Sequence, residues 1–124
     1  MPTPLPTVLL VEDDEAISSA TQLALEMEGY QVRCAYNGVD GLKALEAFKP
    51  NVVLLDVMMP RLNGYEVLER IRQQEEYKDI RVIMLTARGQ EADRSRSMEM
   101  GADGYMVKPF NENELFAKID SLLK

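Results

Sequence analysis

Short apolar runs alternate with helix-patterned stretches along the whole chain, and this alternation limits the possible fold more than any other feature. Four of the runs are predicted to be strands buried on both faces, namely residues 7–11, 51–55, 81–85 and 104–107. A fifth run, residues 31–35, alternates in polarity and is expected at a sheet edge. The pattern predicts a parallel sheet whose strands are joined by right-handed helical crossovers.

The segments between the strands carry apolar stripes at helical spacing, and each stripe is expected to face the core. Asn111 is predicted to cap the last helix, with Glu114 at capping-box distance. Segment 89–100 barely forms a stripe, so it is interpreted either as a surface helix or as an element light enough to shift during switching. The predicted stripes are Ile17, Ala20, Leu23, Ala24 and Met27; Leu42, Leu45 and Phe48; Val67, Leu68 and Ile71; and Leu115, Ile119 and Leu122.

Charge and composition argue against several classes of function. The chain has 14 basic and 21 acidic residues, and the formal charge of −7 opposes non-specific nucleic-acid binding. It has no histidine, which removes imidazole catalysis and histidine metal ligation. The single cysteine, Cys34, cannot form an internal disulfide, so a reducing, cytoplasmic compartment is expected. Residues 1–6 are interpreted as an extended lead-in, with no sign of a signal peptide or membrane span.

Charged and hydroxyl side chains follow the predicted strands at their carboxyl ends. Residues 12–14, Glu-Asp-Asp, follow the first strand and Asp56 follows the third. Thr86 follows the fourth strand and Lys108 the fifth. Carboxyl ends of parallel strands meet at one edge of the sheet, so these side chains are expected to lie close together. Before the second and third helices, "YNG" (36–38) and "RLNG" (61–64) are predicted to form turns in which asparagine and glycine supply permissive backbone.

Four motifs carry a resemblance to a known family. "LLVEDD", "VVLLDVMMPRLNG", "VIMLTA" and "GADGYMVKPF" occur in this order, and together they resemble the receiver domains of two-component response regulators. The resemblance implies a flavodoxin-like (βα)5 fold, an α/β doubly wound five-stranded parallel sheet with strand order 2-1-3-4-5. It also implies Mg²⁺-dependent phosphorylation of an aspartate by a histidine kinase or phosphotransfer protein.

The resemblance assigns the acidic residues of the site. Asp56 stands at the phosphoacceptor position, and Glu12 and Asp13 stand where the family has its metal-binding pair. The backbone carbonyl of Met58 matches a further metal ligand. Asp14 is expected to lie outside the site, since capping the first helix is an adequate role for it.

The same comparison assigns the remaining site residues. Thr86 and Lys108 match the hydroxyl and the ammonium that engage the phosphoryl oxygens. Tyr105 matches the aromatic residue that switches together with Thr86. The Lys108–Pro109 bond is expected to be cis, as the family implies.

Charge balance is consistent with these assignments. Glu12, Asp13 and Asp56 contribute −3 and Lys108 contributes +1, which leaves −2 for one divalent ion. Oxygen ligands favour Mg²⁺, with Mn²⁺ as a possible substitute, over zinc. An aspartate of ordinary pKa is ionised at neutral pH, so Asp56 is expected to need no general base to attack phosphorus.

The sequence argues against two other functions that occur on this fold and leaves a third open. An aspartyl-phosphate phosphatase needs a second aspartate two residues after the first, where this chain has Met58. A flavin or nucleotide module needs a glycine- or hydroxyl-rich loop after the first strand, where this chain has "EDDEA". A receiver that acts only as an interaction module, without phosphorylation, stays open.

Residues 1–124 are expected to form a single receiver domain with no output domain, either as a stand-alone protein or as part of a longer one. It is expected to catalyse only its own phosphotransfer and autodephosphorylation, and to contact a downstream protein target or a separate output domain. Arg94 and Glu114 match a salt-bridge pair of the dimer face formed by the fourth helix, fifth strand and fifth helix in winged-helix transcription factors. Gly104 and Asp120 depart from that face, so a monomer or weak dimer is expected.

Overall fold

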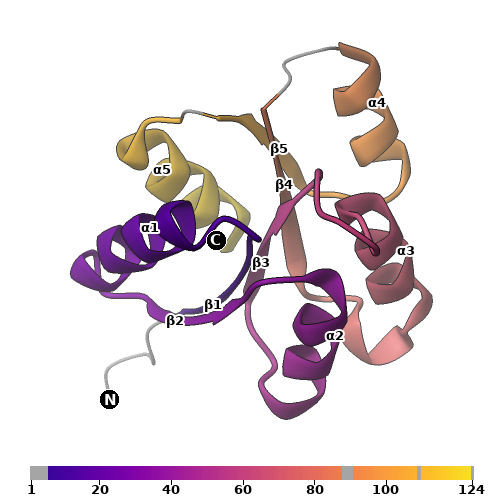
Figure 1. Cartoon of the computed structure of the whole chain (residues 1–124), viewed down its shortest axis with the longest axis horizontal. Helices are drawn as coiled ribbons and strands as arrows, with labels where there is room; N and C mark the ends of the chain where they lie inside the picture. The colour runs from indigo at the N-terminus through magenta and orange to yellow at the C-terminus, as the bar shows by residue number, and fades with distance from the viewer. Residues whose placement is uncertain (1–5, 88–90, 109, 124) are drawn as a thin grey trace.

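The apolar runs of the sequence pair as five parallel strands in the order β2-β1-β3-β4-β5 (Figure 1). The structure is a computed structural model that describes residues 6–87, 91–108 and 110–123, without the side chains of 91–93. The predicted fold class and strand order are confirmed. The strands are β1 (Thr7–Val11), β2 (Gln31–Ala35), β3 (Val52–Asp56), β4 (Arg81–Thr86) and β5 (Gly104–Val107). The helices are α1 (Glu15–Met27), α2 (Gly38–Ala47), α3 (Gly64–Gln73), α4 (Glu91–Glu99) and α5 (Glu112–Leu123), with a short 3-10 helix at Glu75–Tyr77.

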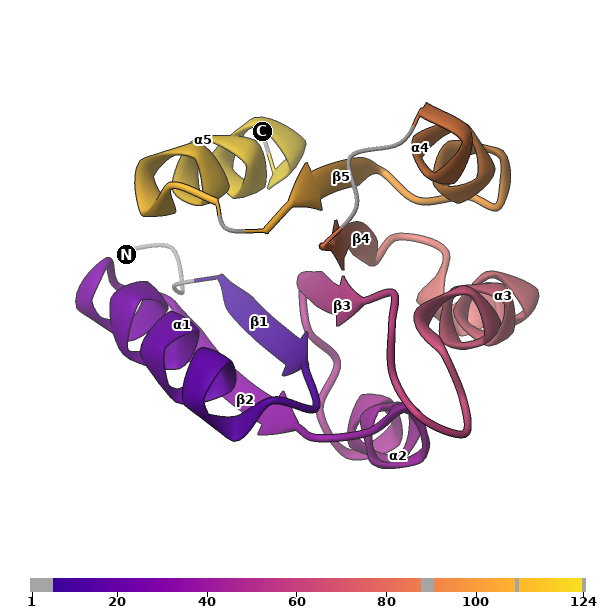
Figure 2. The same cartoon turned by 45° about the horizontal axis from the view of Figure 1, so that its top comes forward.

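Helices cover both faces of the sheet. Helices α1 and α5 lie on one face and α2 and α3 on the other, with α4 on the side of α3 (Figure 2). Successive strand residues point to opposite faces, so Leu54 and Leu55 of β3 belong to two separate apolar cores. Both side chains are fully buried, and each such leucine stabilises the fold by about 1.5–3 kcal/mol. In the described part of the chain, no helix has both the length and the apolar character that a membrane crossing needs.

The strand ends differ slightly from the predicted ones. Strand β3 includes Asp56 and β4 includes Thr86, so both residues belong to the sheet instead of following it. Asp56 lies beside Leu85 in the register, and the N–H of Val57 donates to Leu85 O at 2.8 Å. Strand β5 is an edge strand with Val107 39% exposed, so the prediction that residues 104–107 are buried on both faces is wrong.

The stripe predicted for the first helix faces the solvent side of α1. Leu23 is 59% and Met27 81% exposed, whereas the buried residues of this helix are Ser18 and Leu25. Helix α1 has apolar residues on two sides. Their spacing indicates a helix but does not show which side packs against the core. For the other helices, the residues at the centre of each predicted stripe are buried: Leu45, Val67, Leu68, Ile71, Leu115 and Ile119.

The turn before α3 differs from the predicted one. Asn63 has φ −77° and forms a capping box with Glu66, and the residue with positive φ is Arg61 at 68°. Gly64 is needed for space, since a Cβ there would overlap the carbonyl oxygen of Asp56. Gly38 likewise begins α2 where a Cβ would lie 2.8 Å from Leu62 O.

Asp14 and Asn111 cap the helices that they precede, as predicted, whereas the role of Glu114 in a capping box stays a prediction. Asp14 precedes α1, and its Oδ1 accepts a hydrogen bond from Ile17 N at 3.1 Å. Asn111 precedes α5, and its Oδ1 accepts from Asn113 N at 2.7 Å. The side chain of Asp14 therefore caps α1, which is the role that the sequence predicted for it outside the acidic site.

Candidate functional site

Three carboxylates converge at the carboxyl edge of the sheet. Glu12 and Asp13 follow β1, and Asp56 ends the neighbouring strand β3. One oxygen from each of the three residues lies within 4.8 Å of the other two. Glu12 and Asp56 are 1% and 4% exposed, whereas Asp13 is open to solvent. The arrangement places two buried carboxyl groups close to one accessible carboxylate.

Lys108 comes from the far end of the chain and meets two of these carboxylates. Its Nζ lies 2.5 Å from Glu12 Oε1 and 3.4 Å from Asp56 Oδ1. The N–H of Lys108 donates to Thr86 O at 2.6 Å, which ties the end of β5 to the end of β4. This backbone hydrogen bond therefore positions Lys108 at the edge of the sheet where its ammonium can reach Glu12 and Asp56.

The environment shifts the protonation of this cluster. Burial, the hydrogen bond to Glu12 and the charge of Glu12 raise the pKa of Asp56 to about 7, against the opposing effects of Lys108 and the Met58 N–H. Burial lowers the pKa of Lys108, but its hydrogen bond to Glu12 and the charges of Asp56 and Glu12 outweigh that effect and raise it. Lys108 is therefore a cation at neutral pH, and Asp56 needs further positive charge to be fully ionised.

The donor set fits Mg²⁺. All three side chains offer only oxygen, and opposite ligands of an octahedral Mg²⁺ lie about 4 Å apart. Oxygens spread over up to 4.8 Å can hold one such ion, with some contacts made directly and others through water. The acidic cluster is therefore compatible with magnesium binding.

Met58 lies immediately beside Asp56. Its backbone N–H donates to Asp56 Oδ1 at 3.2 Å, and its side chain is 60% exposed. The role of its carbonyl as a metal ligand stays a prediction. The predicted cis bond involves Pro109, which lies outside the described residues.

Thr86 and Tyr105 share one face of the sheet. Thr86 is buried at the end of β4, and Tyr105 of β5 pairs in register with Met84, two residues before Thr86. Residues two apart on a strand point to the same side, so Thr86 and Tyr105 are diagonal neighbours. Tyr105 is half-buried against the core on the side of α3.

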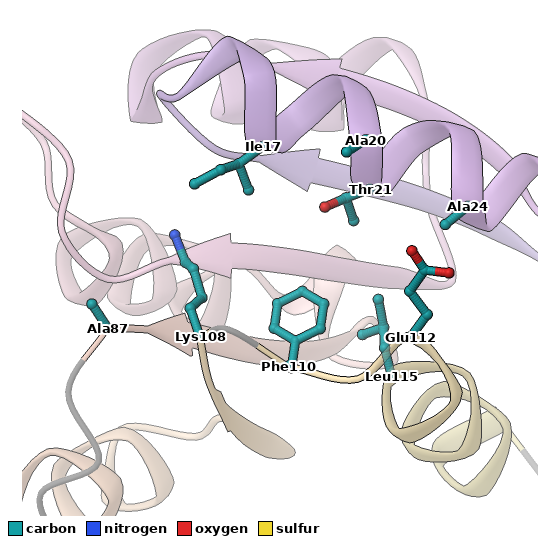
Figure 3. A pocket seen from close by; sticks show the side chains of 9 residues that line it. All are labelled: Ile17, Ala20, Thr21, Ala24, Ala87, Lys108, Phe110, Glu112 and Leu115. Carbon is teal, nitrogen blue, oxygen red and sulfur yellow. The ribbon is translucent and has the colours of Figure 1, made fainter.

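Sequence reasoning missed an apolar groove that opens beside the site. The groove has a volume of about 550 Å³ and lies between α1 and the start of α5, with Lys108 at one end (Figure 3). Its α1 side includes Ile17, Ala20 and Ala24, from the stripe that the sequence predicted to be core. The unusually apolar outer side of α1 was the available signal. Its lining is completed by Thr21, Ala87, Phe110, Glu112 and Leu115.

Comparison with known proteins identifies the family. Residues 8–120 match the response regulator receiver domain. The chain is 39% identical to the DNA-binding dual master transcriptional regulator RpaA of Synechocystis, over 97% of this chain and 50% of that protein. It is 46% identical to a homolog of the transcriptional regulatory protein CpxR in Haemophilus influenzae, over 94% of this chain and 50% of that protein. The chain thus spans about half the length of the curated relatives it matches.

Solved structures agree with this assignment. A CheY-like response regulator receiver domain protein from Methanospirillum hungatei matches with a TM-score of 0.88 and 34% identity, covering 96% of this chain and 94% of that one. The receiver domain of a Pseudomonas aeruginosa sensor histidine kinase, which has a magnesium ion coordinated in its active-site cleft, matches with a TM-score of 0.88 and 28% identity, covering 96% and 98%. With its fold, its acidic cluster and these matches, the chain belongs to the family of response regulator receiver domains of two-component systems.

Proposed function

We propose that this chain accepts a phosphoryl group onto Asp56 from a phosphohistidine on a partner histidine kinase or phosphotransfer protein, in a reaction that requires Mg²⁺. The observation that carries the proposal is the meeting of Glu12, Asp13, Asp56 and Lys108 at one edge of the sheet. Unrelated surface charges have no reason to gather around two buried carboxylates, because desolvation makes such a cluster costly.

The chemistry needs few groups. An Asp56 carboxylate oxygen forms a bond to phosphorus while the bond from phosphorus to the donor imidazole nitrogen breaks, and the leaving imidazole takes up a proton. Lys108 is placed to neutralise charge on the transferred phosphoryl oxygens. Glu12, Asp13, Asp56 and the Met58 carbonyl would hold Mg²⁺, which would neutralise the remaining negative charge when bound. Mn²⁺ has similar ligand preferences and is expected to substitute.

The product is an acyl phosphate, which water hydrolyses back to the Asp56 carboxylate and phosphate. Met58 occupies the position at which an aspartyl-phosphate phosphatase carries its acid/base. The chain therefore acts as a switch that catalyses its own phosphotransfer and autodephosphorylation, with no turnover of an external phosphoester.

The switch is proposed to act through Thr86 and Tyr105. Phosphorylation replaces one negative charge with about two and adds acceptor oxygens, to which the Thr86 hydroxyl donates. Movement of Thr86 makes room for Tyr105, its diagonal neighbour, to turn inward. The α4-β5-α5 face then changes its contacts with a downstream protein target or an output domain.

The groove beside Lys108 is proposed to receive the phosphodonor protein. It is apolar, it is open to solvent, and it ends where Lys108 reaches Asp56 (Figure 3). A partner helix with an apolar face that packs against Ile17 and Ala20 brings a phosphohistidine to the site.

We further propose that this chain is cytoplasmic, that it is a monomer or weak dimer, and that it binds neither nucleic acid nor membrane itself. Residues 1–124 are proposed to act as one receiver domain.

Phosphorylation by a small donor tests the proposal. Incubation with Mg²⁺ and acetyl phosphate is expected to add the mass of one phosphoryl group, measured on the intact protein. Asp56→Asn and chelation of Mg²⁺ should each abolish the adduct. Asp14→Asn, which removes a nearby charge and keeps a helix cap, serves as the matched control and should retain it. A chain that forms no adduct with acetyl phosphate or with a phosphorylated histidine kinase is an interaction module instead.

A further inference from the structure

Helix α4 has little apolar side-chain surface. Its sequence from Glu91 to Glu99 has few apolar residues, and one of them, Met98, is 46% exposed. One contact ties it to α3: the Arg96 guanidinium lies 4.1 Å from the centre of the Tyr65 ring. The ring belongs to a 6% exposed residue and is therefore a fixed platform, whereas Arg96 is at the surface. A guanidinium over an aromatic face at this distance is a favourable cation–π pair.

Tyr65 is in turn placed by the backbone of the phosphoacceptor. It follows Gly64, whose N–H donates to Val57 O at 3.0 Å. A Cβ on Gly64 would overlap the carbonyl oxygen of Asp56 and lie 2.8 Å from the Cα of Val57. No spare room separates the first turn of α3 from the end of β3, so a displacement of the Asp56 backbone must also displace Tyr65.

The far end of α4 has a separate anchor. Arg72 of α3 donates from Nε to Gly101 O at 2.9 Å, and its Nη2 forms a 2.8 Å ion pair with Asp103 Oδ2. These contacts fix the segment that follows α4, while the pair of Arg96 with Tyr65 acts on the helix itself. Helix α4 is thus anchored beyond its carboxyl end, and along its length the stack of Arg96 on Tyr65 joins it to α3.

We propose that Tyr65 and Arg96 form a second connection between Asp56 and α4, separate from Thr86 and Tyr105. The connection rests on the proposed phosphorylation of Asp56. Without the phosphoryl group, the Arg96 stack holds α4 against α3. Phosphorylation shifts the end of β3, Gly64 carries that shift to Tyr65, and the stack loosens and frees α4.

Arg96→Met is the direct test, because it keeps an apolar stem at an exposed position and removes the charge. Hydrogen exchange of the α4 amides is measured with and without acetyl phosphate and Mg²⁺, while intact mass reports the adduct. In the unphosphorylated state, Arg96→Met should speed exchange in α4 about two- to fivefold. In the phosphorylated state it should change nothing. Arg94→Met makes the same change two residues away on α4 and should match the wild type in both states.

A second readout follows the stack itself: the ring-current shift of the Arg96 side chain should fall on phosphorylation. A purely structural contact would speed exchange by the same factor in both states, and that result overturns the connection. An adduct with an unchanged Arg96 resonance overturns it as well and leaves the proposed function intact. Absence of any adduct on the wild type rejects the proposed function and the connection together.

Discussion

Lys108 lies closer to Glu12 than to Asp56, at 2.5 Å from Glu12 Oε1 against 3.4 Å from Asp56 Oδ1. Glu12, the proposed metal ligand, thus holds the ammonium that faces Asp56, the proposed phosphoacceptor. Lys108→Met should slow phosphorylation by acetyl phosphate at least tenfold, by loss of charge neutralisation at the reacting oxygens.

The same variant leaves two buried carboxylates without their cation. In the absence of Mg²⁺ it should lower the free energy of unfolding by about 3 kcal/mol, and Mg²⁺ should restore part of the loss. Urea unfolding with and without Mg²⁺ measures both. Lys49→Met, at an exposed position, is the control and should leave rate and stability unchanged.

The pKa of Asp56 predicts how stability depends on pH. In the metal-free folded chain this pKa is raised from 3.8 to about 7, so the folded state binds more protons than the unfolded state between these values. Protonation of Asp56 therefore adds to the free energy of unfolding. This contribution is fully present below about pH 4 and is lost as the pH rises to 7. Asp56→Asn should be more stable than the wild type at pH 7.5 in a chelator, and this advantage should shrink steadily toward pH 5. A constant difference across that range would contradict the raised pKa.

The affinity for Mg²⁺ should also depend on the protonation of Asp56. Mg²⁺ competes with the proton on Asp56, so its affinity should fall as the pH drops below 7. Calorimetric titration with MgCl₂ at pH 6 and pH 8 should show weaker binding and proton release at the lower pH.

Ala20→Glu separates protein donors from small ones. A charge in the apolar groove should slow transfer from a histidine kinase that phosphorylates the wild type, by tenfold or more, because the partner must bury it. Acetyl phosphate does not use the groove and should react at the normal rate. Ser19→Glu adds the same charge at the neighbouring exposed position and should not affect either donor. Equal slowing of both donors would argue against docking in the groove.

Met58 is expected to control the lifetime of the phosphorylated state. Its backbone N–H donates to Asp56 and its side chain is 60% exposed, so we expect this apolar side chain to hinder the approach of water to the phosphorylated residue. Met58→Asn should speed loss of the phosphoryl group about threefold or more, followed as phosphate release after removal of the donor. Met27→Asn makes the same change at a distant, 81% exposed methionine and should have no effect. Unchanged dephosphorylation in Met58→Asn rejects this role.

Ser18 is a place where the chain can be stabilised. It is fully buried, and within the described residues its hydroxyl has no hydrogen-bond partner. Ser18→Ala removes that cost and improves helix propensity, so stability should rise by about 1 kcal/mol. Thermal unfolding measures the change, and exposed Ser19→Ala should give less than half of it. A loss of stability would show that the hydroxyl is engaged.

Sequence patterns predicted the sheet closely because β-strands buried on both faces leave continuous apolar runs. Strand β1 has the predicted bounds, and the limits of β3 and β4 shift by one residue at most to include Asp56 and Thr86. The residues at the strand ends could therefore be named in advance, since topology alone gathers them.

Helical periodicity was less informative. In α1 it identified the helix, but Leu23 and Met27 face solvent, because the same spacing serves packing and docking alike. The need for Gly64 also lay beyond local sequence, since it arises from the backbone of Asp56, eight positions earlier in the chain. Contacts between distant segments, such as Arg96 with Tyr65, leave no periodic trace.

Glu12 and Lys108 are separated by 96 positions in the chain, and their contact closes the site. The pair cannot form during synthesis until β5 has left the ribosome and added to the sheet as its last strand. A nascent or C-terminally nicked chain therefore carries Asp56 without the ammonium that faces it. The proposed phosphotransfer therefore depends on the last strand of the sheet to form, as well as on the acidic residues that follow β1 and end β3.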